Sequence, residues 1–320
     1  MEKIKLGIMG TSDIAFRRFL PALLKQSEFK YTGVASRVYS NTEKFTKPYG
    51  GKGYNSYNEL IEDSEVDAIY VPLPPALHYE WAMKALKRGK HVLLEKPFTI
   101  ELQHTKEILD LARAKELTVH ENYMFIYHSQ LERIKEIVND GLLGHVRLYR
   151  IAFGFPKREA NDFRYDKKLG GGALLDCGGY PLRLAVNLLG CTTTVTASKL
   201  NYSPEFDVDL YGSATLENNE GQVAQVSFGM DNSYKCELEI WGSEGSLLAT
   251  RIFTAGDEFE PTLILKIGNE EKTIQLAADD QFLGSINRFY CGINHSEVRR
   301  ELYDEILCQA RLIEKIRGSE

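Results

Sequence analysis

The sequence predicts a two-domain α/β protein, with an N-terminal doubly wound parallel sheet and a C-terminal α+β domain built on a large, open, mixed or antiparallel sheet. Short apolar segments alternate with helical patterns over the first 120 residues, which is typical of parallel strands joined by crossover helices. Past Asn122 that alternation stops, and strand-like segments dominate from Thr192 to Leu276. The 320 residues are enough for two domains, expected at residues 1–122 and 123–320.

Five β-rich segments are the expected strands of the first domain: Ile4–Met9, Tyr31–Ala35, Val66–Val71, His91–Leu94 and Leu117–Val119. Between them, apolar residues recur at helical spacing, as in Phe16, Phe19, Leu20, Leu23 and Leu24. Pro21 lies inside that first helical stripe. Because proline lacks a backbone N–H, it is expected to kink the helix.

The second domain is expected to open with a helix ending at Gly141, a strand over Val146–Phe153, a glycine-rich loop and another helix. Further expected strands include Ala214–Leu216, Val223–Phe228, Cys236–Trp241 and Leu263–Ile267. A terminal helix over residues 299–317 closes the chain, with apolar residues along one side.

Composition and charge exclude several classes of protein. The net charge is −6 and no long basic run occurs, so neither nucleic-acid nor membrane-surface binding is expected. No signal peptide or bilayer-spanning apolar stretch is recognisable. The five cysteines never form a Cys-x-x-Cys pair, which is typical of free thiols in a reducing compartment. We therefore expect a cytoplasmic protein that takes a small-molecule partner and holds no metal.

The first strand-to-helix turn, Gly10–Ala15, resembles the dinucleotide-binding pattern Gly-x-Gly-x-x-Gly/Ala of a Rossmann domain. Ser12 stands where the second glycine is usual. Serine is small, so a pyrophosphate could still approach the backbone at the helix start, in the residues Gly10, Thr11, Ser12, Asp13 and Ile14. A second interpretation stays open at this stage, in which Gly10 only begins a helix that Asp13 caps.

The end of the second expected strand bears on the choice of nucleotide. NAD-binding domains commonly place an acid there to hold the ribose 2′-hydroxyl, whereas this chain has Ser36 and Arg37. An arginine and a hydroxyl suit a 2′-phosphate, which a carboxylate would repel. The sequence therefore favours NADP(H) over NAD(H), with a solvated loop arginine as the alternative interpretation of Arg37.

Glu95-Lys96-Pro97 directly follows a central expected strand, His91–Leu94. Ligands bind at the carboxyl ends of strands in such sheets, so Lys96 is expected near a nicotinamide. Partial desolvation should lower the pKa of this lysine, and Glu95 should oppose that shift. Lys96 could then donate a hydrogen bond or a proton to a carbonyl oxygen as hydride arrives at carbon.

A second polar set is expected on a helix that begins near Asp176. Four polar residues share one face of this helix, opposite an apolar face: Asp176, Tyr180, Arg183 and Asn187. A carboxylate, a phenol and a guanidinium after a glycine-rich approach indicate a binding site. Asp176 as a simple N-cap, and Tyr180 with its hydroxyl in water, are the alternatives.

Three motifs together resemble the Gfo/Idh/MocA oxidoreductase family, which includes glucose-fructose oxidoreductase and dimeric dihydrodiol dehydrogenase: Gly10-x-Ser-x-x-Ala15, Glu95-Lys96-Pro97 and Asp176-x-Gly-x-Tyr180. The resemblance covers essentially the whole chain. It is greatest to NDP-sugar 3-ketoreductases, in stretches beginning at Asp13, Val71, Glu121 and Leu169. Many relatives have histidine where this chain has Tyr180, and tyrosine fits the ketoreductase branch.

The resemblance implies roles for individual residues. Lys96 and Tyr180 would flank the reacting carbon, and the cofactor would be lined by Pro72, Leu73, His78, Glu95 and Asn122. His128 would touch substrate, or else cap a helix or pack. Apart from the resemblance, Arg164 in the loop before the glycine run is expected to meet a phosphate of a nucleotide sugar, or else to be a solvated loop residue. Asp176 and Arg183, from the polar helix face, complete the candidate substrate set. A homodimer or homotetramer through the C-terminal sheet is also implied.

The expected reaction is hydride transfer between NADP(H) and a sugar ketone or alcohol, with a nucleotide-linked 3-ketosugar as the expected substrate. Tyr180 is the expected general acid and Lys96 its electrostatic partner, although the sequence leaves open which of them delivers the proton. One alternative is a dihydrodiol or free-sugar dehydrogenase of the same family. Another is a nucleotide-sensing regulator, against which the retention of both residues argues.

Overall fold

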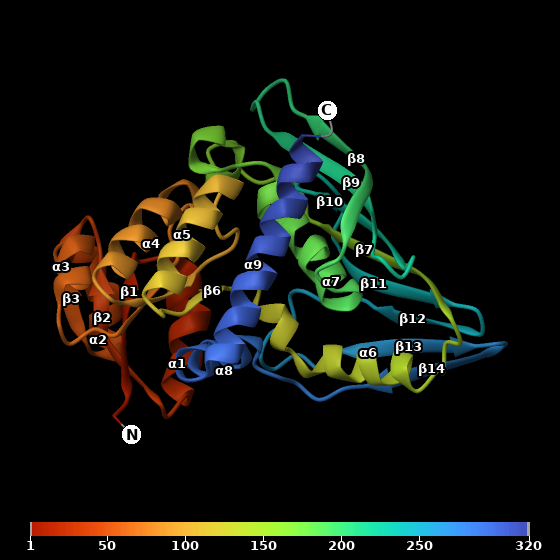
Figure 1. Cartoon of the computed structure of the whole chain (residues 1–320), viewed down its shortest axis with the longest axis horizontal. Helices are drawn as coiled ribbons and strands as arrows, with labels where there is room; N and C mark the ends of the chain where they lie inside the picture. Colours follow the sequence, from red (N-terminus) through yellow and green to blue (C-terminus); the bar gives the residue numbers. More distant parts are fainter. Residues whose placement is uncertain (1, 319–320) are drawn as a thin grey trace. The chain divides into compact units, whose positions relative to one another are not determined.

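A computed structural model describes residues 2–318, and these form two compact units (Figure 1). The first unit runs up to Asn122 and also contains Phe282–Leu307, whereas the second comprises Tyr123–Gln281 and the residues from Cys308 onward. The sequence assigned everything after residue 122 to the second domain. Phe282–Leu307 differs because it packs on the first unit: the Phe289 and Phe29 rings stack 6.2 Å apart, and the Tyr303 hydroxyl donates to the Leu117 carbonyl.

The first unit is a six-stranded, fully parallel sheet in the order β3-β2-β1-β4-β5-β6. Its strands are β1 (Ile4–Met9), β2 (Phe29–Ala35), β3 (Lys52–Tyr54), β4 (Ala68–Val71), β5 (His91–Leu94) and β6 (Val119–Glu121). The expected doubly wound sheet is confirmed. β3 was not expected, because Lys52-Gly53-Tyr54 carries no apolar run. The strand order reverses between β1 and β4, which is where sheets of this kind bind ligands.

Helices of the first unit are α1 (Leu20–Lys25), α2 (Glu43–Tyr49), α3 (Tyr57–Glu62), α4 (His78–Lys87), α5 (Leu102–Ala114) and nearly all of α8 (Gln281–Asn294). α9 (Ser296–Arg317) begins in this unit and ends in the other, and it starts three residues before the expected 299. Short 3₁₀ turns lie at Tyr39–Thr42 and Pro75–Leu77.

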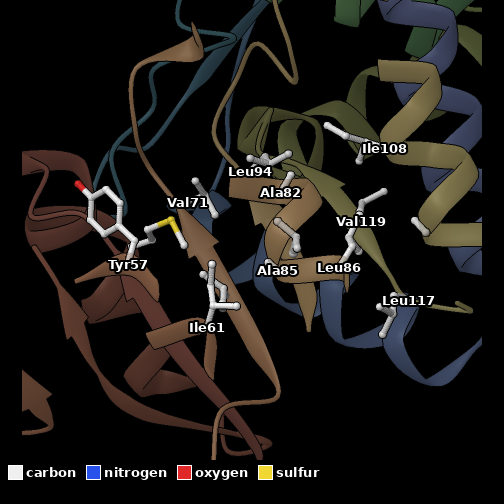
Figure 2. Close-up of a cluster of buried hydrophobic side chains, with 14 of the residues drawn as sticks. Tyr57, Ile61, Val71, Ala82, Ala85, Leu86, Leu94, Ile108, Leu117 and Val119 are labelled. Atoms are coloured by element: carbon white, nitrogen blue, oxygen red, sulfur yellow. The ribbon is translucent and has the colours of Figure 1, made fainter. Parts of the chain in front are cut away.

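A core of fully buried side chains fixes the strand ends of this sheet (Figure 2). Val71 and Leu94, the last residues of β4 and β5, lie in one cluster with Ala82 and Leu86 of α4 and Ile108 of α5. Interiors of this kind are packed at crystal-like density, so they resist small displacements. The residues that follow Val71 and Leu94 therefore start from rigid positions.

The helix after β1 is wider than an α-helix in the turn that precedes Pro21. Ala15–Phe19 is π-helical, and the Leu20 N–H bonds to the Ala15 carbonyl, five residues earlier. Pro21 has no N–H to offer the preceding turn, and the Phe16 carbonyl accepts a hydrogen bond from the Tyr49 hydroxyl instead (3.3 Å). The disruption expected at this proline thus takes the form of a wider turn.

The second unit is built on an eight-stranded sheet in the order β14-β13-β12-β11-β7-β10-β9-β8. Only β7 and β10 pair in parallel, so the expected mixed sheet is confirmed. Its strands are β7 (Val146–Gly154), β8 (Thr194–Tyr202), β9 (Asp209–Glu217), β10 (Val223–Gly229), β11 (Lys235–Gly242), β12 (Gly245–Ala249), β13 (Thr262–Ile267) and β14 (Glu270–Gln275). β14 was not expected, because it is an exposed, charged edge strand without apolar alternation.

The helices of this unit are α6 (Ser129–Asn139), α7 (Gly179–Leu189) and the end of α9, with 3₁₀ turns at Met124–Tyr127, Phe163–Tyr165 and Lys167–Leu169. α7 packs on β7 and β10, and the strands bury alternate residues against one face of the sheet. Within residues 2–318, no helix combines the length and apolar character needed to cross a bilayer.

Gly33 offers a direct test of the β2–β3 pairing. It has a φ of +155°, and a Cβ there would lie 2.0 Å from the Lys52 carbonyl oxygen. Because backbone cannot move aside cheaply, Gly33→Ala should lower the free energy of unfolding by about 2–4 kcal/mol in urea titrations.

Gly50→Ala is the matched control, since Gly50 also has a positive φ (+72°) but open space around it. With a ψ of −153°, its backbone conformation is one that only glycine readily adopts, so this variant should cost about 1–3 kcal/mol of strain and less than Gly33→Ala. Equal losses in the two variants would contradict this account of the pairing.

Candidate active site

Five of the predicted cofactor residues each follow directly on the end of a strand of the first sheet: Gly10 after β1, Ser36 after β2, Pro72 after β4, Glu95 after β5 and Asn122 after β6. Because all these strands are parallel, their carboxyl ends share one edge of the sheet. The sequence motifs of the first domain thus gather along a single edge.

The turn after β1 requires glycine. Gly10 has a φ of +109°, and a Cβ there would lie 2.8 Å from Cδ2 of Leu73. The Gly10 N–H is bonded to the Ala35 carbonyl (2.9 Å), which ties the turn to the end of β2. Gly10 and Leu73, predicted from separate motifs, are therefore neighbours.

Ser12 caps the helix that begins at Asp13. Its Oγ accepts a hydrogen bond from the Ala15 N–H (3.2 Å). Asp13 instead forms an exposed ion pair with Arg17, so the interpretation in which Asp13 caps this helix is wrong. The serine that replaces the usual glycine therefore acts as the helix cap. Thr11, Ser12 and Ile14 are all partly exposed.

Arg37 is tied to the same edge through a residue that the sequence did not single out, Tyr57. Burial raises the pKa of Tyr57, and the charge and hydrogen bond of Arg37 oppose that rise. The Tyr57 hydroxyl lies 3.9 Å from where a Cβ of Gly10 would be. The side chain of Arg37 is exposed, but it is held beside the turn after β1, while Ser36 is buried and its Oγ accepts from the Val38 N–H (3.3 Å).

The Glu95 carboxylate is held by two donors on one oxygen. The Tyr70 hydroxyl of β4 and the Asn122 Nδ2 each donate to Glu95 Oε1 at 2.6 Å. These two hydrogen bonds fix the position of that oxygen. The other oxygen, Oε2, accepts from the backbone N–H of Lys96 (3.4 Å). Lys96 itself is partly exposed directly beyond β5.

His78 is fully buried, and both its ring nitrogens face backbone carbonyls. Nδ1 lies 2.9 Å from the Pro97 oxygen and 3.2 Å from that of Phe98, and Nε2 lies 2.8 Å from the Leu73 oxygen. Burial lowers the pKa of His78, and the charge of Lys96 lowers it further. The resemblance placed His78 against the cofactor, whereas in the structure it joins the loop after Lys96 to the loop after β4.

In the second unit, the helix that carries Tyr180 begins at Ala173 and is π-helical over Leu174–Gly178 before α7. Asp209 caps it, since its Oδ2 accepts from the Leu174 N–H (2.6 Å). Asp176 is buried inside the first turns, so its interpretation as the N-cap is wrong.

Arg164 forms a partly buried ion pair with Asp176, Nε to Oδ2, at 2.7 Å. Its Nη1 also donates to Asp162 Oδ1 at 3.0 Å. Burial alone would lower the pKa of Arg164, but the two carboxylates outweigh it and the pKa is raised. Arg164 is therefore not a solvated loop arginine. The glycine run allows the backbone of Gly171 to lie close to that of Arg164, because a Cβ on Gly171 would lie 2.4 Å from the Arg164 carbonyl oxygen.

The Tyr180 ring is enclosed by aromatic side chains, with centroid distances between 5.0 and 5.7 Å to Tyr123, Phe125, Phe153 and Phe253. Only 8% of the residue is exposed, so it is not a boundary tyrosine. Such an enclosure fixes the ring and lowers the local dielectric, which strengthens any interaction of its hydroxyl. Sequence reasoning missed these four rings, which come from separate parts of the chain.

The two remaining substrate candidates are buried. Arg183 lies on α7 and is 3% exposed. His128 caps α6, with Nδ1 accepting from the Gln130 N–H (3.1 Å), so its helix-cap interpretation describes the structure. Burial lowers the pKa of His128, and Asp279 partly opposes this. Among residues 2–318 no cluster of three or more His, Cys, Asp or Glu side chains is placed to hold a metal.

The donor set at the first sheet edge fits NADP(H). The turn at Gly10 leads into a helix start with partly exposed residues. Arg37 and Ser36 offer a cation and a hydroxyl at the end of β2, and Glu95 with Asn122 supplies polar groups beyond the switch point. No acid occupies the position that would hold a ribose 2′-hydroxyl.

Comparison with known proteins agrees with this geometry. A family model described as "Oxidoreductase family, NAD-binding Rossmann fold" matches residues 4–123, and one for the GFO/IDH/MocA C-terminal domain matches residues 131–248. A dTDP-3,4-didehydro-2,6-dideoxy-alpha-D-glucose 3-reductase from Actinomadura kijaniata is 37% identical, over 98% of this chain and 95% of its own. A protein of the same name from Streptomyces violaceoruber is 40% identical over 90% and 85%.

Among solved structures, the 3-ketoreductase KijD10 from Actinomadura kijaniata, in complex with NADP and TDP-benzene, is similar with a TM-score of 0.95 and 36% identity, over 99% of this chain and 98% of that one. Variants of KijD10 with one lysine changed to alanine, or one tyrosine changed to phenylalanine, match over the same shares of both chains.

The Arg164–Asp176 pair is testable by a double-mutant cycle in urea unfolding. Arg164→Met and Asp176→Asn should each lower the free energy of unfolding, by about 1–3 kcal/mol, because each strands a partly buried charged or polar partner. The coupling energy should be about 1–2 kcal/mol.

The exposed pair Lys167–Asp207, at 3.0 Å, is the control, and its coupling should stay below about 1 kcal/mol. A coupling for Arg164–Asp176 no larger than for this surface pair would show that the two side chains do not depend on each other.

Proposed function

This chain belongs to the Gfo/Idh/MocA oxidoreductase family, and from that premise we propose that it transfers hydride between NADP(H) and the 3-keto group of a nucleotide-linked sugar. The observation that carries the proposal is the Glu95 carboxylate, fixed by hydrogen bonds beside Lys96 at the carboxyl end of β5. The substrate class is supported by the names of relatives that match nearly the whole chain.

The cofactor would be held by residues along the carboxyl edge of the first sheet. The turn from Gly10 to Ile14 would receive the pyrophosphate through the backbone N–H groups that follow Gly10, and Arg37 with Ser36 would receive the 2′-phosphate. Pro72, Leu73, Glu95 and Asn122 would line the nicotinamide end. When bound, the cofactor supplies the hydride.

Lys96 and Tyr180 have complementary tasks on the substrate oxygen. As carbon gains hydride, the carbonyl oxygen gains negative charge, and preorganised donors lower the barrier by stabilising that charge. Tyr180 donates its phenolic proton to the oxygen, and the Lys96 ammonium stabilises first the oxyanion and then the tyrosinate. A proton from solvent restores the phenol.

The second unit supplies the proposed sugar and phosphate contacts. Asp176 would accept from a sugar hydroxyl, and Arg164 would meet a phosphate oxygen while its other donors stay on Asp162 and Asp176. Arg183 and His128, both buried, would act by supporting α7 and α6.

Assembly and location complete the proposal. One face of the second sheet carries a broad hollow lined by polar and charged side chains, among them Arg150, Lys199, Gln225 and Glu237. Trp241 is 52% exposed on the neighbouring β11. We propose that this face joins copies of the chain into a homodimer or homotetramer.

The five cysteines are free thiols, which supports the cytoplasm as the location of the protein.

Two rival functions predict different behaviour. A free-sugar or dihydrodiol dehydrogenase would turn over sugars or diols without a nucleotide. A nucleotide-sensing protein would bind NADPH without consuming it. A panel of dTDP-linked ketosugars and free sugars separates all three functions when turnover is measured by the decay of NADPH fluorescence.

Lys96→Met should reduce kcat for ketone reduction by at least about 10²–10⁴-fold, because it removes the cation that stabilises the oxyanion. Its NADPH dissociation constant should stay within about threefold of wild type, a change of under 1 kcal/mol. Tyr180→Phe should show a loss of the same order.

The exposed Lys87→Met is the control for the loss of a lysine, and it should leave both parameters unchanged. Wild-type turnover in Lys96→Met would remove this lysine from the mechanism.

Arg37→Ala should weaken NADPH binding by about 10- to 100-fold, since a hydrogen bond to a charged group contributes about 1.5–3 kcal/mol. NADH binding should change little, so the ratio of the two dissociation constants, measured by fluorescence titration, is the readout. Arg88→Ala, which removes an exposed arginine paired with Glu62, is the control. Equal weakening for both nucleotides would contradict the assignment of Arg37 to the 2′-phosphate.

A further inference from the structure

A chain of hydrogen bonds runs from Glu95 into the interior of the first unit. Asn122 Nδ2 donates to Glu95 Oε1 (2.6 Å), and the Asn122 Oδ1 accepts from the Ser285 hydroxyl of α8 (2.7 Å). The Ser285 Oγ lies 2.9 Å from Nε2 of His120 in β6. Ser285 enters this chain only through folding, because α8 returns to the first unit after the whole second sheet.

The direction of each hydrogen bond is fixed by valence. The Asn122 amide presents its NH₂ group to a carboxylate oxygen of Glu95 and its own oxygen to the Ser285 hydroxyl. The single hydroxyl proton of Ser285 is used on that oxygen. His120 must therefore donate from Nε2 to Ser285 Oγ, and every donor in the chain points toward the carboxylate.

The interior members of this chain are almost inaccessible to solvent. His120 is 0% exposed, and Ser285 and Asn122 are each 1% exposed. Burying polar groups contributes little net stability even when they are paired, and apolar side chains of similar shape can be as stable. A buried His–Ser pair at this position is therefore better explained by what it orients than by what it stabilises.

What the pair orients is the Asn122 amide. Rotation of that amide by half a turn would place its oxygen against the Glu95 carboxylate, and two acceptors would then face each other. Ser285 opposes the rotation because, with His120 donating to its Oγ, the hydroxyl proton would lose the Asn122 oxygen as its acceptor. The Tyr70 hydroxyl, whose ring stacks 3.7 Å from that of Phe19, holds the same Glu95 oxygen from the other side.

We propose that Ser285 and His120 are positioning residues that set the Asn122 amide and, through it, the Glu95 carboxylate beside Lys96 for cofactor binding. This deepens the proposed function and rests on it, because Asn122 and Glu95 are its nicotinamide-lining residues. Ser285 and His120 act through Asn122.

Three variants test the proposal by separating affinity from stability. Ser285→Ala removes the donor to Asn122 and should weaken NADPH binding by about fivefold to tenfold, the range for one lost neutral hydrogen bond. In Ser285→Ala the imidazole N–H of His120 loses the Ser285 hydroxyl as its acceptor. The double variant His120→Phe/Ser285→Ala also removes that N–H and keeps a ring against Phe289. It should unfold at a higher urea concentration than Ser285→Ala, yet bind NADPH as weakly. Ser285→Thr, which keeps the hydroxyl, should bind NADPH within about twofold of wild type.

The measurements are the NADPH dissociation constant by fluorescence and the urea midpoint of each variant without cofactor. An affinity that rises and falls with the urea midpoint across the three variants would overturn the proposal, since that is what a purely structural role gives. Unchanged affinity in Ser285→Ala would overturn it too. If wild-type protein itself does not bind NADPH, the proposed function fails instead, and the two failures are distinguishable.

Discussion

The placement of one carboxylate underlies the organisation of the first unit. Glu95 leaves the buried end of β5 and is met on Oε1 by Tyr70 and Asn122, from the strands on either side. Because both donors arise at the ends of strands fixed in a close-packed core, the carboxylate has little freedom. Its second oxygen meets the Lys96 backbone, and His78 ties the loop after this lysine to the loop after β4. A cationic side chain thus starts from a rigid base.

The second unit fixes the position of a phenol, the side chain of Tyr180. Aromatic rings surround Tyr180, while the glycine run lets backbone approach Arg164 closely enough for its guanidinium to reach Asp176. Asp209 satisfies the helix start, so Asp176 is free of capping and can pair with Arg164. Polar and aromatic groups are therefore fixed separately in this unit, the first by ion pairing and the second by packing.

Most of the local structure could be predicted from the sequence, since alternating periodicity and motifs at strand ends identified the parallel sheet, the turn at Gly10 and the Glu95-Lys96 segment. Partners brought together by folding could not be predicted. Nothing local in Tyr70, Ser285 or Tyr57 marks it as a neighbour of Glu95, Asn122 or Arg37. The two predicted helix caps were wrong. Asp209, distant in the sequence, caps the helix expected to begin with Asp176, and Ser12 caps the helix expected to be capped by Asp13. The short β3 and the charged edge strand β14 lacked the periodicity that reveals longer strands.

The proposed mechanism requires the ammonium of Lys96 and the phenol of Tyr180 to act on one substrate oxygen. A kinetic double-mutant cycle on single-turnover ketone reduction, with Lys96→Met and Tyr180→Phe alone and combined, measures this most directly. If both groups act on one oxygen, the combined variant loses little more rate than the slower single variant. Losses that multiply across the cycle would mean that the two side chains act independently, and would contradict the account.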